Sequence, residues 1–261
     1  MKRSRAWSLI RKQPHYRHEA FLAGLSAAGF DVLAGVPDAP HCGDVLVIWN
    51  RYGEHEVIAD RFEAAGGHVL VAENGYLGAG GTSPKADVAG GPQPGHYYAL
   101  ARHAHNGRGQ WPDGGPERFQ ALGVTLKPWR DMDAGKYVLV APNRSFGMRG
   151  GIMPNDWAER AAADLRRIGF AVRIRRHPGN MRPDRSLEED LAEASWVRVW
   201  SSSVGVRALI EGLRVAVDAP WWICKNWQDV GRERALQRMA WAQWTVDEIA
   251  NGTAIRALID L

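Results

Sequence analysis

Residues 171–180 (AVRIRRHPGN) and 196–220 (WVRVWSSSVGVRALIEGLRVAVDAP) decide the fold that we expect for this chain. Within them, residues 171–174, 196–200 and 215–217 are short apolar runs rich in β-branched side chains. Patterns typical of helices separate the three runs. This alternation predicts a βαβαβ unit with a parallel sheet.

Polar residues follow the first two of these predicted strands. One strand ends at His177 and Pro178, and the next ends at Ser201, Ser202 and Ser203. Ligands of open α/β sheets bind outside the carboxyl ends of the strands, and a serine-rich helix start can hold an anion. We therefore expect a phosphate or diphosphate between them. The alternative is that the serines only cap a helix and that His177 is an ordinary loop residue.

The first half of the chain repeats the alternation of strand and helix. Strands are predicted at residues 7–10, 31–36, 44–49 and 68–72, and helices at residues 16–28 and 54–65. The second half starts with a predicted strand at 136–141 and a helix at 156–167, and it closes with helices at 231–244 and from Thr245 onward. We expect two Rossmann-like α/β domains facing across a cleft, residues 1–130 and 131–261.

Glu73 follows the predicted strand at 68–72, so it is a candidate general base. Asn74 and Tyr76 lie beside it. The alternative is a turn with a solvated glutamate. Between residues 77 and 129 the regular pattern ends, and we expect a long functional loop. His103 and His105 have a spacing that a metal could use, but no nearby carboxylate or cysteine completes a ligand set, so no metal is expected.

Several classes of protein are excluded. Neither half carries G-x-G-x-x-G, G-x-x-x-x-G-K-[ST] or G-x-S-x-G, which argues against dinucleotide oxidoreductases, P-loop NTPases and α/β-hydrolases. No apolar run is long enough to span a membrane, so we expect a cytoplasmic protein. The net charge of +4 suits phosphate-bearing ligands. A nucleotide-sugar-dependent glycosyltransferase fits what remains, with the donor in the second domain and the acceptor in the first.

Residues 173–220 resemble the capsule-polysaccharide and Kdo-transferase group of GT-B glycosyltransferases. The resemblance rests on His177-Pro178, on Ser202-Ser203, and on a small-residue helix that ends in Gly212-Leu213-Arg214-Val215. The chain departs from that group at Arg207, where the group has glutamate, and at Arg214, where it has proline. Glu211 is the candidate substitute for the missing glutamate. The resemblance implies a GT-B-like fold and a nucleotide-sugar donor.

A second resemblance is to a group of tailed-phage proteins that are loosely assigned as glycosyltransferases. It rests on HNGRGQWPDGGPERFQALGVTLKPWR (residues 105–130), RHPGN (176–180) and MAWAQWTVDEIANG (239–252). It implies a bacteriophage enzyme in the host cytoplasm, with 5-hydroxymethylcytosine in phage DNA as the acceptor. DNA is then the expected partner, reached through a flipped base.

Each candidate residue has an expected role in this scheme. The expected base is Glu73, or failing it Asp113 or His105. The expected donor site comprises Arg144, Ser145, His177, Pro178, Ser201, Ser202, Ser203, Val204 and Glu211. The expected acceptor residues are Asn74, Tyr76, Arg102, Asn106, Arg108, Trp111 and Arg118. No tightly bound cofactor is expected, and the co-substrate is a nucleotide-sugar, with UDP-glucose or another UDP-sugar favoured.

Three other interpretations stay open. The first keeps the donor and replaces DNA with a capsular or lipid-linked glycan. The second is a non-catalytic module that binds a nucleotide or a phage partner. The third is an epimerase of the same fold that acts on UDP-GlcNAc, which needs more carboxylates in the cleft than the sequence places there.

Overall fold

The computed structural model describes residues 4–35, 39–77, 97–144, 147–178 and 183–261. The chain divides into two compact units. The first comprises Met1–Arg118 and Gln237–Leu261, and the second comprises Phe119–Leu236. Both units are α/β, as predicted, but the last segment of the chain belongs to the first unit and not to the second half. No described helix is long and apolar enough to cross a membrane.

The first unit contains a six-stranded sheet in the order β10-β5-β4-β3-β1-β2. Its strands are β1 (Arg5–Ser8), β2 (Asp31–Leu33), β3 (Val45–Trp49), β4 (His68–Asn74), β5 (Tyr97–Arg102) and β10 (Gln243–Thr245). The pairs among β1, β2, β3 and β4 are parallel, whereas β5 pairs antiparallel with both β4 and β10. The predicted parallel arrangement therefore holds for the first four strands.

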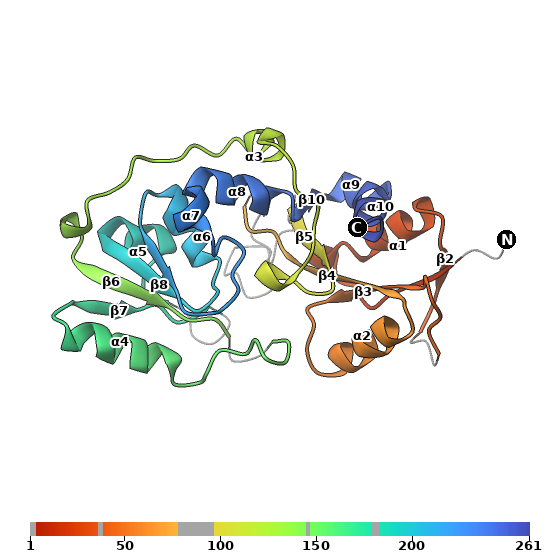
Figure 1. Ribbon diagram of the computed structural model, residues 1–261, viewed down its shortest axis with the longest axis horizontal. Coiled ribbons are helices and arrows are strands. Elements are labelled where there is room, and N and C mark those ends of the chain that lie inside the picture. The colour runs from red at the N-terminus through yellow and green to blue at the C-terminus, as the bar shows by residue number, and fades with distance from the viewer. Residues whose placement is uncertain (1–3, 36–38, 78–96, 145–146, 179–182) are drawn as a thin grey trace. The chain divides into compact units, whose positions relative to one another are not determined.

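Helices cover both faces of this sheet (Figure 1). They are η1 (Pro14–Tyr16), α1 (His18–Ala27), α2 (Glu54–Ala64), η2 (Asn106–Arg108), α9 (Val246–Ala250) and α10 (Thr253–Ile259). One core packs Phe21 and Leu25 of α1 against Val45 and Val47. The other packs Phe62 of α2 against residues of the opposite face. Adjacent side chains of β3 enter different cores because successive residues of a strand point to opposite faces.

Strand β5 and the return of the chain through β10 were not predicted. Residues 97–101 (YYALA) lie inside the stretch that we expected to be irregular, because glycine, proline and histidine surround them. Tyr98 and Leu100 are fully buried, so the run is a core strand. Trp244 of β10 pairs with Tyr98 and is also buried. This antiparallel pair joins the end of the chain to the first unit.

The second unit contains a four-stranded parallel sheet in the order β7-β6-β8-β9. The strands are β6 (Tyr137–Ala141), β7 (Val172–Ile174), β8 (Ala194–Val199) and β9 (Val215–Val217). Its helices are η3 (Met132–Ala134), α4 (Trp157–Arg167), α5 (Leu187–Glu193), α6 (Val204–Ile210) and α7 (Trp227–Val230). The boundary segments hold α3 (Glu117–Ala121) and α8 (Arg232–Ala240). The βαβαβ prediction from residues 171–220 is confirmed.

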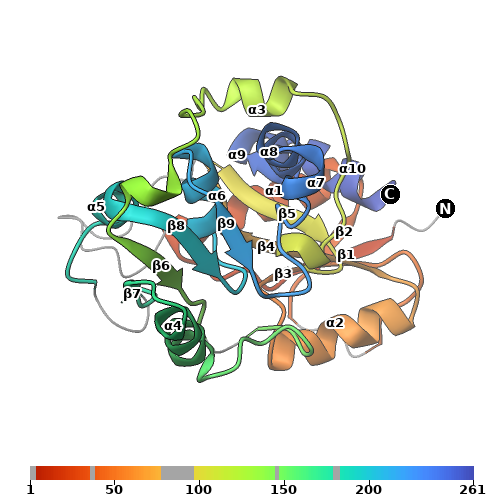
Figure 2. The ribbon, with the colours of Figure 1, turned by 60° about the vertical axis from the view of Figure 1, so that its left-hand side comes forward.

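Helices also lie on both faces of the second sheet. Trp157 and Leu165 of α4 pack with Val138 and Val140 of β6 in one core. Figure 2 shows α4 on one side of β6 and β8, with α5 and α6 on the other. The chain therefore leaves β6 toward one face and leaves β8, its neighbour, toward the other. This is a topological switch point, where open α/β sheets bind their ligands.

Candidate functional site

The carboxyl edge of the second sheet gathers most of the predicted donor residues. Asn143 and Arg144 follow β6, His177 follows β7, and the serine run follows β8. Because β6 lies between β7 and β8 and all three strands are parallel, these segments leave the sheet at the same edge. The structure thus brings Arg144, His177 and the serines to one end of the unit, next to the switch point. Ser145 lies outside the described residues.

Asn143 connects the two strands of the switch point. Its side-chain oxygen accepts a hydrogen bond from the backbone N–H of Ser201 at 2.9 Å. Asn143 was not among the predicted donor residues, although it stands two residues beyond the predicted strand at 136–141. Position after a strand was the available signal, and it was applied to Arg144 and Ser145 but not to Asn143.

The serine run contributes less to an anion site than the sequence suggested. Ser201 and Ser202 are buried. The hydroxyl of Ser202 accepts from the N–H of Val204 at 3.3 Å, and its carbonyl accepts from the indole of Trp222 at 3.1 Å. Ser203 is the N-cap of α6, but its side chain makes no capping hydrogen bond. Helix α6 has only seven residues. Ser201 and Ser202 are buried, so Ser203 is the serine of this run that has an exposed side chain at the carboxyl edge.

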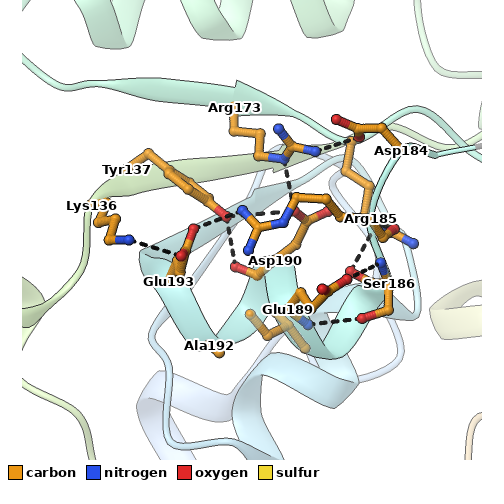
Figure 3. Close-up of polar contacts among 12 residues, drawn as sticks. Lys136, Tyr137, Arg173, Asp184, Arg185, Ser186, Glu189, Asp190, Ala192 and Glu193 are labelled. Atoms are coloured by element: carbon orange, nitrogen blue, oxygen red, sulfur yellow. Dashed lines mark hydrogen bonds and ion pairs between the residues drawn. The ribbon is translucent and has the colours of Figure 1, made fainter.

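A buried ion cluster joins β7 and the residue that follows it to α5 (Figure 3). Asp190 is 0% exposed. Its carboxylate accepts from Arg173 Nε at 2.7 Å and from Arg175 Nη1 at 2.6 Å. The hydroxyl of Tyr137 donates to the Asp190 carbonyl at 3.2 Å. Burial and the negative charge of Asp190 raise the pKa of Tyr137, so this hydroxyl stays protonated at neutral pH.

Arg175 connects the cluster to both sides of the His177 segment. Its backbone N–H donates to Val140 in β6 at 2.9 Å. Its Nη1 donates to the carbonyls of Arg185 at 2.8 Å and Ser186 at 3.2 Å. Ser186 then begins α5 through a capping box with Glu189. Arg175 stands two residues before His177, so these contacts fix the chain on both sides of the segment that carries His177. Pro178 is exposed at the last described position before the gap.

The sequence also did not indicate an aspartate, Asp218, at the carboxyl edge of the second sheet. Asp218 follows β9, and its carboxylate accepts from the indole of Trp157 at 2.7 Å and from Arg198 Nε at 3.0 Å. Trp157 lies at the start of α4, so this carboxylate fixes α4 against the edge strand. Nothing in the sequence pattern distinguished this aspartate from a turn residue.

Glu211 does not belong to this edge, which corrects the sequence prediction. It is the C-cap of α6, at the opposite end of the helix from Ser203. Its carboxylate forms an ion pair with Lys127. The chain runs back along α6 from the carboxyl edge, so Glu211 lies near the amino end of the sheet. Glu211 therefore lies too far from the donor residues to substitute for the glutamate that the resembled group has at the position of Arg207. Arg207 itself approaches Glu188 at 3.6 Å.

In the first unit, Glu73 lies within β4 and not beyond it. Glu73 pairs with Ala99 and Asn74 pairs with Tyr98 in the ladder with β5. The Glu73 carboxylate accepts from the N–H of Asn74 at 2.8 Å. These are the last residues of β4, so Glu73 still lies near the carboxyl end of a parallel strand, where a site is expected.

Two of the predicted acceptor residues come together in this unit. The hydroxyl of Tyr76 accepts a hydrogen bond from the N–H of Asn106 at 2.9 Å. This contact connects the residues that follow β4 with those that follow β5. His105 precedes Asn106 and Arg108 ends η2. Burial, with a smaller effect of the Arg108 charge, lowers the pKa of His105 to about 4. His105 is therefore neutral at pH 7 and a weak base.

Trp111, Asp113 and Arg118 have internal partners. The indole of Trp111 donates to the carbonyl of Arg238 at 3.0 Å, and Asp113 pairs with Arg238 at 3.5 Å. Arg118 bonds the carbonyl of Gln243 at 2.7 Å and Glu248 at 2.5 Å. It also stacks on Trp244 with its guanidinium carbon 4.2 Å from the ring centroid. These contacts attach the C-terminal segment to the rest of the first unit. They give each of the three residues a structural partner within the chain, so none of the three needs an acceptor substrate to explain its presence.

Arg102 is the last residue of β5 and is half-buried. Within the part of the chain that the structure describes, its Nε is buried without a hydrogen-bond partner. Burial, followed by the charge of Arg102, lowers the pKa of His68. Among the described residues, no group of three His, Cys, Asp or Glu side chains could hold a metal ion.

Comparison with known proteins shows the fold. No family model matches the chain, and no curated protein matches it. Two solved structures from Thermosulfurimonas dismutans are similar. The first, KpsC, beta Kdo 2,4 transferase, has a TM-score of 0.59 at 14% identity and covers 93% of this chain and 91% of its own. The second, KpsC, beta Kdo 2,7 transferase, has a TM-score of 0.53 at 13% identity and covers 98% and 99%. The chain shares the fold of these proteins over most of its length.

Proposed function

We propose that this protein is a glycosyltransferase that moves a sugar from a nucleotide-sugar donor to an acceptor hydroxyl. The observation that carries the proposal is the convergence of Arg144, His177 and Ser203 at the carboxyl edge of the second sheet, beside its switch point. The fold adds support, because the two similar structures are both named as Kdo transferases.

Arg144 and His177 are the proposed phosphate-binding residues. As the bond between the sugar and the nucleotide breaks, negative charge develops on the leaving phosphate oxygen. A guanidinium and an imidazole that are positioned beforehand stabilise this charge without having to reorganise. The Ser203 hydroxyl is the proposed third donor. The Asp190–Arg175 contacts hold the His177 segment in place for this role.

Glu73 is the proposed general base. It takes the proton of the acceptor hydroxyl as that oxygen attacks the anomeric carbon. The other two candidates fit less well, because Asp113 pairs with Arg238 and because the pKa of His105 is about 4. A carboxylate base predicts inversion at the anomeric carbon.

For the acceptor, we propose a saccharide hydroxyl first and 5-hydroxymethylcytosine in DNA second. DNA has less support, because Trp111 and Arg118, the expected contacts to DNA, are occupied by Arg238, Glu248 and Trp244. The net charge of +4 is compatible with either acceptor.

The test is a transfer assay with a panel of nucleotide-sugars, including UDP-glucose, offered with an oligosaccharide acceptor or with hydroxymethylcytosine DNA. Mass spectrometry reads out any sugar added to either acceptor. We expect one donor to give product with the wild type and His177→Ala to abolish it. His41→Ala is the matched control, since His41 is exposed in the first unit.

Near-normal turnover by His177→Ala would contradict the donor-site assignment. Nucleotide binding without any transfer would favour the non-catalytic module. Interconversion of the free sugar nucleotide would favour the epimerase.

A further inference from the structure

Two basic side chains that the proposed function does not use lie at the edge of the first sheet where β4 begins. His68 is the first residue of β4, and Arg102 is the last residue of the antiparallel strand β5. Arg102 pairs with Leu70 in the ladder between these strands, whereas Glu73 pairs with Ala99. The two basic residues therefore lie toward the opposite end of β4 from the proposed base.

The side chains of His68 and Arg102 are neighbours on one face of the sheet. His68 stands two residues before Leu70 in β4, and Arg102 lies directly opposite Leu70. Residues two apart on a strand share a face, so all three side chains point the same way. Diagonal neighbours of an antiparallel pair are about 7–8 Å apart, which long side chains can bridge. Burial lowers the pKa of His68, and the charge of Arg102 adds to this effect, as their proximity requires.

Each of the two side chains has a buried nitrogen without a hydrogen-bond partner. Within the part of the chain that the structure describes, these atoms are Arg102 Nε and His68 Nδ1. Buried polar groups of native proteins nearly always have a partner, and an exception can mark an ion or a water molecule that belongs there. Both residues are only half-buried, so the pair lies near the surface, where a small ligand can enter from solvent.

The carboxylates at this edge are engaged by other groups. Asp44 accepts from the N–H of His68 through its carbonyl, at 2.7 Å, but its carboxylate pairs with Arg5. Glu63 pairs with His103, the residue that follows β5. The charge of the neighbouring guanidinium is therefore not neutralised by either carboxylate.

The chain that follows Arg102 is held in a strained conformation. His103 has a φ of 69°, in the left-handed region that residues other than glycine seldom adopt. Its N–H donates to Val69 at 2.8 Å, its carbonyl accepts from Arg51 at 2.6 Å, and its Nδ1 lies 2.8 Å from Glu63. Strained residues persist only where their surroundings hold them, and they cluster at functional sites. These contacts fix the backbone from which Arg102 extends.

We propose that Arg102 and His68 bind a phosphate group at this edge, as inorganic phosphate or as a phosphomonoester. The guanidinium donates two parallel N–H bonds to two of its oxygens, and His68 Nδ1–H donates to a third. A tetrahedral anion fits this pair better than a planar carboxylate does, because the guanidinium alone occupies both oxygens of a carboxylate. This site is distinct from the donor site proposed for the second unit.

Calorimetric titration of the whole chain at constant ionic strength tests the proposal. The probes are inorganic phosphate, phenyl phosphate and acetate. We expect inorganic phosphate to bind at least about tenfold more tightly than acetate, since acetate has no third oxygen for His68 and a hydrogen bond to a charged group contributes about such a factor. Tighter binding of phenyl phosphate than of inorganic phosphate would assign the site to a phosphomonoester, and the reverse would assign it to free phosphate.

Arg102→Gln should weaken phosphate binding by at least about tenfold, because it removes the charge and the pair of parallel N–H bonds. Arg61→Gln is the matched control, since Arg61 is an exposed arginine of α2 in the same unit. It should bind phosphate as the wild type does.

His68→Leu separates binding from structure. It removes the second donor, so it should weaken phosphate binding by about tenfold. In buffer without phosphate it should raise the thermal midpoint, because it also removes a buried nitrogen without a partner. A purely structural role for His68 predicts a lower midpoint and unchanged phosphate binding.

Hydrogen exchange read by mass spectrometry locates the bound phosphate. Phosphate should slow exchange in peptides covering residues 66–70 and 101–104. The same protection is expected in His177→Ala, because His177 belongs to the donor site proposed for the second unit. A failure of the proposed function therefore leaves this inference standing.

The proposal is overturned if the wild type binds no phosphate, if Arg102→Gln and His68→Leu bind it normally, or if phosphate slows exchange in the second unit alone. A higher midpoint for His68→Leu in a protein that has no affinity for phosphate would show that a water molecule occupies the place instead.

Discussion

Gly212 belongs to a sequence motif that suggested ligand binding, but its role in the structure is to allow close packing of the backbone. It belongs to the segment by which the chain resembles capsule glycosyltransferases. Its φ is 80°, and a Cβ placed there would lie 2.0 Å from the carbonyl oxygen of Pro128. The N–H of Arg130 donates to its carbonyl at 2.8 Å, and the N–H of Lys127 donates to Ile210 at 2.9 Å. Gly212 therefore lets residues 127–130 pack against the end of α6.

Gly212→Ala should lower the free energy of unfolding by about 2–4 kcal/mol, through left-handed strain and the clash with Pro128. Gly169→Ala is the control, because Gly169 has a φ of 93° and open space around its Cβ position. It should cost only the strain, about 1 kcal/mol. Urea titrations of both variants measure the difference. Equal losses would show that the packing of residues 127–130 is not the cause.

His105 predicts a dependence of stability on pH. Its pKa is about 4 in the folded chain against 6.5 as the ordinary value, because burial and the charge of Arg108 oppose protonation. Below pH 6.5 the unfolded chain binds the proton more readily than the folded chain does. Stability should therefore fall as the pH drops from 6.5 toward 4, and the contribution of this residue should level off below that.

Urea titrations at several pH values should show a smaller decline for His105→Gln than for the wild type. The lowered pKa values of His15 and His68 contribute to the same window, so the difference between the two proteins isolates His105. An unchanged slope would contradict its burial as a neutral ring.

At the scale of elements, the Asp190 cluster determines how β7, its following segment and α5 fit together. Asp190 of α5 neutralises Arg173 of β7 and Arg175 beyond it. The sequence predicted both the strand and the acidic helix from their patterns. It did not indicate which of the acidic residues of α5 points inward, since charge pattern alone does not separate a buried carboxylate from exposed ones.

Asp190→Ala should destabilise the protein by about 3–5 kcal/mol, since it leaves two arginines without their buried partner. Asp184→Asn is the control, because Asp184 pairs with Arg173 from a side chain that is 74% exposed, and exposed pairs contribute about 1 kcal/mol or less. Hydrogen exchange in residues 174–178 should also quicken in Asp190→Ala. Equal stability of the two variants would mean that the cluster does not hold the His177 segment.

For the whole molecule, the sequence predicted the features that depend on residues close together in the chain. Strands β1 to β4 and β6 to β9, the helices that connect them, the parallel pairing of these strands and the edge that carries His177 follow from hydrophobic periodicity and from the carboxyl-end rule. Arg118 and Gln243 illustrate what could not be predicted. Arg118 was assigned to an acceptor, but it bonds the carbonyl of Gln243, far along the chain. The predicted boundary at residue 130 differs from the two units of the structure, because the C-terminal segment packs on the first unit through the β5–β10 pair and through helices α9 and α10.

The site was predicted less completely than the fold. Asn143 and Asp218 were missed because their roles depend on which strands are neighbours, and neighbour order is a property of the folded sheet.

The proposed activity requires the carboxyl edge of the second sheet to hold the phosphate groups of the donor. Hydrogen exchange read by mass spectrometry, with and without a saturating nucleoside diphosphate such as UDP, tests it most directly. We expect slower exchange on nucleotide addition in peptides covering residues 142–144, 175–178 and 200–204, and no such change in His177→Ala. Protection confined to the first unit, or the same protection in His177→Ala, would contradict it.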